Sequence, residues 1–112
     1  MSRDDVLRVV RRDHPASDFE EVLAILDEYG VESWHRERDR VHLAVLKLAA
    51  GDLEELRRQI ELARTDYRDA LAEAEFPENL TRRVPTGRSS AAEQAAMDDR
   101  DWDQYQRWLV GP

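Results

Sequence analysis

Cysteine is absent from this sequence of 112 residues, and glycine is scarce, with four residues. The missing thiols exclude disulfide bonds, thiolate zinc sites and cysteine nucleophiles. The sequence also lacks a glycine-rich phosphate loop, a nucleophile elbow and the pair of Glu-x-x-His motifs that diiron proteins use. The scarcity of residues and motifs from which active sites are built favours a non-catalytic protein. We therefore expect no catalytic residue and no cofactor.

Long hydrophobic runs are missing as well. The most apolar stretch, "VHLAVLKLAA" at residues 41–50, contains His42 and Lys47. It is much shorter than the roughly 20 apolar residues that span a bilayer. The N-terminus, "MSRDDVLRVV", has neither the basic start nor the long apolar run of a signal peptide. We therefore expect a cytoplasmic protein that does not associate with membranes.

The charge balance is acidic, with a formal net charge of -8, and Lys47 is the single lysine among 17 basic residues. Nucleic-acid binding depends on neutralising phosphates, so no nucleic-acid partner is expected. Arginine instead suits planar pairing with carboxylates, which are plentiful here.

Apolar residues recur at helical spacing, no segment shows the alternation of a strand, and the predicted fold class is all-α. We expect a small helical bundle over residues 2–76, built on a long helical hairpin. Three capping signals support this division. Ser2 precedes Asp4 and Asp5, Ser17 precedes Glu20, and Asp52 precedes Glu55 directly after a stop at Gly51.

Two of the predicted helices form the hairpin. The first runs from about Ser33 to Ala50 and has an unusually broad apolar face, so we expect it to be the central helix. The second is predicted as one continuous helix up to Pro77. Its stripe steps by three and four residues through Leu53, Leu56, Ile60, Ala63, Tyr67, Ala70 and Ala74.

The last third of the chain divides into a linker and a helix. Residues 77–90, "PENLTRRVPTGRSS", are rich in turn residues and are predicted as a linker. Ser90 and Glu93 form a capping box that opens an amphipathic helix over residues 91–110. Its predicted apolar stripe contains Ala91, Ala95, Trp102, Tyr105 and Leu109, with Met97 and Trp108 beside it.

Arg40–Pro77, with "VLAILDEYG" upstream, resembles a small family of uncharacterised bacterial all-helical proteins over about residues 4–78. The resemblance implies a recurring all-helical unit. It implies no activity, ligand or catalytic residue, because none is attached to that family.

The arrangement most like a metal site is "HRERDRVH", which places His35, Asp39 and His42 at i, i+4 and i+7. Two histidines and a carboxylate are a known ligand set, but His35 and His42 lie two turns apart on a straight helix. These three residues are therefore weak candidates. His14 is a weak candidate for a remote third ligand or a general base, because a lone histidine before proline is usually solvated.

Large aromatic residues supply the candidate interaction site: Trp102, Tyr105, Trp108 and Leu109 in the tail, together with Tyr67. Tyr67 sits among charged residues but also continues a core stripe, and we favour the core role. For the tail we favour docking on its own chain or on a sister chain, with a foreign partner as the alternative.

These observations favour a non-catalytic protein–protein interaction or regulatory module, either homodimeric or bound to another protein. The alternative is a small-molecule or metal-binding protein, enzymatic or not, that uses His14, His35, Asp39 and His42.

Overall fold

The computed structural model describes residues 2–30, 37–78 and 91–111, and every regular element in those ranges is helical. The all-α fold class is confirmed. The elements in chain order are α1 (Arg3–Asp13), the 3-10 turn η1 (Ala16–Asp18), α2 (Phe19–Leu26), α3 (Arg38–Ala49), α4 (Leu53–Thr65), α5 (Tyr67–Glu75) and α7 (Ala91–Val110). No helix in the described ranges is long and apolar enough to cross a membrane.

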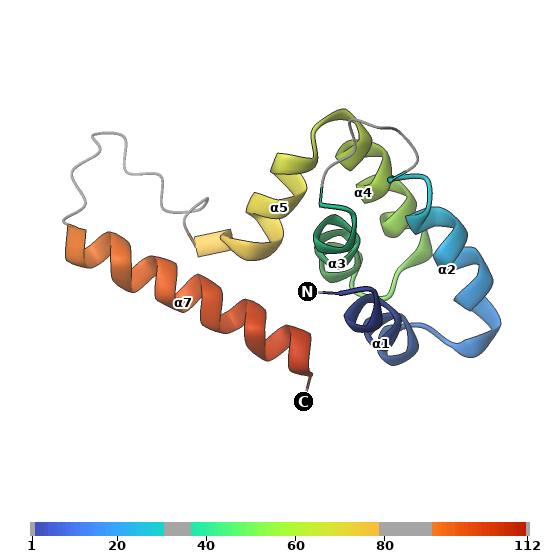
Figure 1. The fold of residues 1–112 in the computed structure, drawn as a ribbon, viewed down its shortest axis with the longest axis horizontal. Coiled ribbons are helices and arrows are strands. Elements are labelled where there is room, and N and C mark those ends of the chain that lie inside the picture. Colours follow the sequence, from blue (N-terminus) through green and yellow to red (C-terminus); the bar gives the residue numbers. More distant parts are fainter. Residues whose placement is uncertain (1, 31–36, 79–90, 112) are drawn as a thin grey trace.

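Helix α3 is the centre of the bundle, as its broad apolar face predicts. Residues 41–46 and Ala49 are all buried, and α3 packs against α1, α4 and α5. Figure 1 shows α1 and α3 in the middle, α2 and α4 to one side, and α5 and α7 to the other. The predicted start near Ser33 is wrong in part, because Glu37 adopts a left-handed conformation that no α-helix contains, and α3 begins after it. Residues 33–36 lie outside the described residues.

The predicted helix caps are confirmed at two of the three positions within the described residues. Ser2 and Asp5 form a reciprocal capping box at the start of α1, and the Asp52 side chain accepts the Glu55 N–H at 3.0 Å. The capping box at Ser17 is wrong. The chain makes the turn η1 there, and α2 begins at Phe19 without a side-chain cap.

The long second arm of the hairpin is two helices, which corrects the continuous helix predicted from the stripe. The chain becomes extended at Asp66, whose carboxylate accepts the Arg68 N–H at 3.1 Å and caps α5. Aspartate favours such local bonds over a place inside a helix. The change of direction lets both α4 and α5 pack on α3. The sequence pattern could not predict it, because apolar residues keep the same spacing on both sides of the bend.

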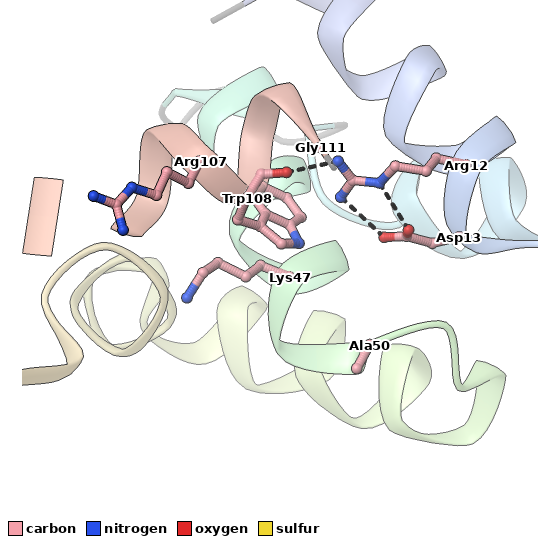
Figure 2. Close-up of a pocket in the computed structure, with 7 residues that line it drawn as sticks. All are labelled: Arg12, Asp13, Lys47, Ala50, Arg107, Trp108 and Gly111. Carbon is pink, nitrogen blue, oxygen red and sulfur yellow. Dashed lines mark hydrogen bonds and ion pairs between the residues drawn. The ribbon is translucent and has the colours of Figure 1, made fainter. Parts of the chain in front are cut away.

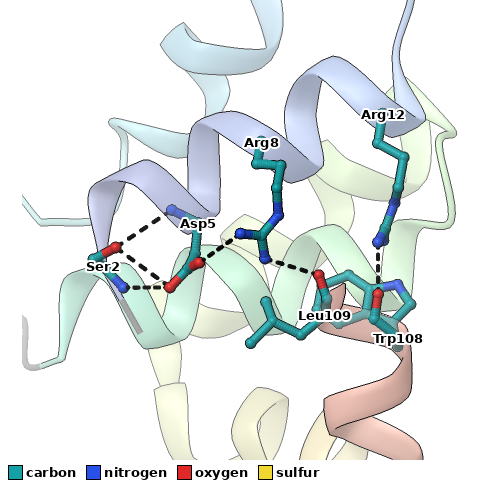
Figure 3. A network of polar contacts seen from close by, with 6 residues as sticks. All are labelled: Ser2, Asp5, Arg8, Arg12, Trp108 and Leu109. Atoms are coloured by element: carbon teal, nitrogen blue, oxygen red, sulfur yellow. Dashed lines mark hydrogen bonds and ion pairs between the residues drawn. The ribbon is translucent and has the colours of Figure 1, made fainter. Parts of the chain in front are cut away.

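Helix α7 covers residues 91–110 as predicted and packs back onto the bundle. Arg8 of α1 donates from Nη2 to the Leu109 carbonyl at 2.9 Å, and Arg12 donates from Nη1 to the Trp108 carbonyl at 2.6 Å. These carbonyls belong to the last turn of α7, where the helix has no internal donors for them. As Figure 3 shows, two arginine side chains of α1 donate hydrogen bonds to the C-terminal carbonyls of α7 and so cap this helix.

The other contacts of α7 reach the end of α5 and the residues that follow it. The Asp101 carboxylate accepts the backbone N–H of Glu78 at 2.9 Å, and Gln104 Nε2 donates to the Ala74 carbonyl at 3.2 Å. Arg100 pairs with the Glu78 carboxylate at 2.7 Å. Hydrogen bonds and an ion pair therefore hold much of the second half of α7 against the bundle.

The buried face of α7 differs from the predicted stripe. The buried residues are Met97, Asp101, Tyr105 and Leu109, whereas Ala91, Ala95 and Trp102 are exposed. The hydrophobic pattern of the sequence predicts the wrong buried face of α7 for two reasons. The alanines offer little area to bury, and Asp101 is polar yet finds a backbone donor inside.

The predicted division into a domain, a linker and a separate helix stays a prediction, because residues 79–90 lie outside the described residues. Tyr105 and Leu109 nevertheless belong to the same hydrophobic core as α1 to α5.

The tight connection between α3 and α4 gives the first testable prediction. Gly51 has a φ of +84°, and a Cβ there would lie 2.9 Å from the Asp13 carbonyl oxygen. Gly51→Ala should therefore lower the free energy of unfolding by about 1–3 kcal/mol, measured by urea denaturation. Ala50, which is also left-handed with a φ of 50°, provides the control. Ala50→Gly should leave stability equal or higher, and equal stability of Gly51→Ala and the wild type would contradict the account.

Candidate functional site

The outer face of α7 presents the most prominent aromatic side chain of the described residues. Trp102 is 50% exposed, and its ring stacks on Tyr105 with centroids 6.2 Å apart and planes 15° from parallel. Tyr105 is itself completely buried, so Trp102 rests on a fixed support. The five residues predicted to interact thus divide: Tyr105 and Leu109 are in the core, Trp108 and Tyr67 are partly buried against it, and Trp102 faces outward.

Tyr105 lies beside an ion pair whose acidic member is buried. Arg40 of α3 binds Glu75 of α5 with two hydrogen bonds, one of them 2.7 Å from Nε to Oε2, and the Glu75 side chain is 1% exposed. Burial raises the pKa of Tyr105, and the negative charge of Glu75 raises it further. The Tyr105 hydroxyl is therefore neutral at physiological pH. These groups join α3, α5 and α7 rather than offering a reactive site.

A cleft of about 830 Å³ opens where α1, α3 and α7 end (Figure 2). Its lining residues are Arg12, Asp13, Lys47, Ala50, Arg107, Trp108 and Gly111. The guanidinium of Arg12 lies over the Trp108 ring, 5.2 Å from its centroid, and also binds the Asp13 carboxylate at 2.9 Å. Sequence reasoning missed this cleft, because it joins residues from three distant helix ends.

Among the described residues, the metal candidates do not form a metal site. His42 is completely buried, and its Nε2 lies 2.9 Å from the Tyr29 carbonyl, so this nitrogen carries the proton and donates. Its Nδ1 faces Arg3 Nη1 at 3.5 Å and accepts. A cation at Nδ1 would meet the Arg3 guanidinium. His35 lies outside the described residues, and within those residues no group of three His, Asp or Glu side chains is placed to hold an ion.

His14 is buried rather than solvated, which corrects the expectation for a loop histidine. It is 4% exposed, and neither ring nitrogen has a hydrogen-bond partner among the described residues. It also lies far from His42. Arg3, which contacts His42, and His14 stand at opposite ends of α1, about 16 Å apart along the helix. The two imidazoles therefore lie near opposite ends of α1.

No family model, no curated protein and no solved structure matches this chain. The resemblance of residues 4–78 to a bacterial helical family therefore stays a prediction, and the candidate site rests on the geometry alone.

The environment of His42 predicts a pH dependence of stability. Burial lowers the pKa of His42, and the charges of Arg38 and Arg3 lower it further, outweighing the Tyr29 carbonyl and Asp27. Unfolding restores an ordinary pKa of about 6.5, so the unfolded chain takes up a proton that the folded chain resists. The titration of His42 therefore does not reduce the free energy of unfolding above about pH 7, and it reduces it as the pH falls through 6.5.

The His42→Gln variant isolates this effect, because its amide can still donate to the Tyr29 carbonyl and does not titrate. We expect the free energy of unfolding to fall between pH 7.5 and pH 5 by about 1 kcal/mol more in the wild type than in the variant. Parallel slopes in urea titrations at several pH values would show that His42 is not held neutral.

Proposed function

We propose that this protein is a non-catalytic interaction module that binds another protein chain through the outer face of α7. The half-exposed indole of Trp102 is the observation that carries the proposal. Tryptophan is strongly enriched among the residues that dominate binding energy at protein interfaces. The face is supported from behind by Tyr105, so little side-chain entropy is lost when a partner covers Trp102.

The surroundings of Trp102 favour a protein partner over a small molecule. The cleft at the helix ends does not include Trp102 among its lining residues, and the next residue after Trp102, Asp103, forms an exposed ion pair with Arg107. An apolar centre with a charged rim is the usual composition of a protein interface. A second copy of the chain and a different protein both fit this chemistry, and the experiment below separates them.

The alternative, a small-molecule or metal-binding protein built on the histidines, has less support. His14, at the C-terminal end of α1, and His42, on α3, are both buried, and both nitrogens of His42 are already bonded. A ligand could reach these histidines only if the fold rearranged, whereas the Trp102 surface is already exposed.

The proposal predicts that Trp102→Ala weakens association by about 2 kcal/mol, or roughly thirtyfold, because the indole is the centre of the contact. Leu62→Ala is a matched control, since Leu62 is also 50% exposed but lies on α4. Sedimentation over a wide concentration range tests self-association. Capture from native extract on immobilised protein, quantified for all three proteins, tests a foreign partner.

Both variants should melt within a few degrees of the wild type, because each removes a half-exposed side chain. A wild-type protein that stays monomeric and captures nothing would overturn the proposal. So would a Trp102→Ala variant that associates as strongly as the wild type.

A further inference from the structure

The cleft at the helix ends is a second candidate site, and Trp102 is not among its lining residues. Of its seven lining residues, three are basic and one is acidic, in a chain whose formal net charge is -8. Its volume, about 830 Å³, lies within the range of small-molecule sites. A local excess of positive charge in an acidic protein indicates an anionic ligand.

Much of this charge is already used by the fold. Arg12 binds the Asp13 carboxylate and the Trp108 carbonyl, so it holds the Trp108 ring in place and is not free for a ligand. The C-terminal ends of three helices also add partial negative charge here. The remaining positive charge is small, which disfavours a doubly charged anion such as phosphate.

Lys47 is the cation that the fold leaves available. It is the only lysine of the chain, it is half-buried, and its ammonium makes no ion pair with any described residue. Burial lowers the pKa of Lys47, and the charge of Asp101 only partly offsets this effect. A bound anion would supply the missing partner.

Arg107 is the second group within reach of a ligand. Its ion pair with Asp103 is exposed, and such pairs contribute little, so the guanidinium can exchange partners. Figure 2 shows the Lys47 ammonium and the Arg107 guanidinium on the same side of Trp108. The indole ring and Ala50 supply an apolar wall beside the two cations.

We infer that this cleft binds a single carboxylate carried on an apolar body. Lys47 and Arg107 hold the carboxylate, and Trp108 packs against the body. A small organic acid and the C-terminal carboxylate of a polypeptide present the same chemistry.

The test is calorimetric titration of the full chain with paired probes. Phenylacetate and its neutral amide form one pair, and an apolar hexapeptide with a free or an amidated C-terminus forms the other. Inorganic phosphate tests whether the cleft also binds a doubly charged anion. The expected result is saturable binding of a carboxylate probe, with its neutral counterpart at least about tenfold weaker. Binding of the peptide alone identifies a polypeptide terminus, and binding of phenylacetate identifies a small acid.

Variants assign the residues. Lys47→Met keeps the apolar stem and should weaken carboxylate binding about tenfold or more, and Arg107→Gln should weaken it several-fold. Arg64→Gln is the matched control, because Arg64 also forms an exposed ion pair, with Glu61, but lies on α4. Arg64→Gln and Trp102→Ala should both bind like the wild type, which separates this site from the proposed interaction surface.

A second readout uses the wild-type chain and does not depend on how the variants fold. Saturating carboxylate should slow the acetylation of Lys47 by acetic anhydride, followed by mass spectrometry of the peptide that contains this single lysine. Four results would overturn the inference: no saturable binding of either carboxylate, equal binding of the neutral probes, phosphate binding without carboxylate binding, or an unchanged acetylation rate at saturation.

Discussion

The burial of Tyr105 is the constraint on which the arrangement of this protein depends. Its ring is fully buried in the core, close enough to Glu75 and Arg40 for both charges to act on its hydroxyl. The Glu75 carboxylate is also buried, and a buried charge is tolerated only when it is paired. Helix α7 therefore helps to cover an ion pair that joins α3 to α5, and removing α7 would expose the Glu75 charge and the pocket that the Tyr105 ring fills.

The two surfaces proposed for function follow from this docking. Trp102 is presented outward because Tyr105 faces inward and supports it. The cleft is lined by Arg107 and Trp108 of α7 and by Gly111 directly after it, and Arg8 and Arg12 hold this helix end in place. A chain with an undocked α7 would lack the cleft and would carry Trp102 on a helix that the core no longer holds. The stability of the fold and its capacity to bind are thus expected to rise and fall together.

Features that depend on neighbouring residues could be predicted from the sequence. The caps at Ser2 and Asp52, the buried position of α3 and the extent of α7 all follow from short-range spacing. Features set by contacts between distant segments could not. Asp66 breaks a stripe that looks continuous, and Asp101 is buried because Glu78 offers it a backbone donor.

The histidines illustrate the same limit. Spacing alone aligned His35, Asp39 and His42 as ligands, yet the carbonyl of Tyr29 and the guanidinium of Arg3 occupy the two nitrogens of His42. Neither partner is close to His42 in the sequence. The cleft was equally hidden, since Lys47 and Trp108 come from helices that meet only in the folded chain.

The most direct test of the account is thermal unfolding of a chain that lacks residues 98–112. If α7 is part of the core, its loss exposes the ring pocket of Tyr105 and the Arg40–Glu75 pair, and the melting temperature should fall by at least about 10 °C. A truncated chain that melts at the temperature of the full protein would contradict the account. In that case the C-terminal helix would be a separate handle and not a structural element.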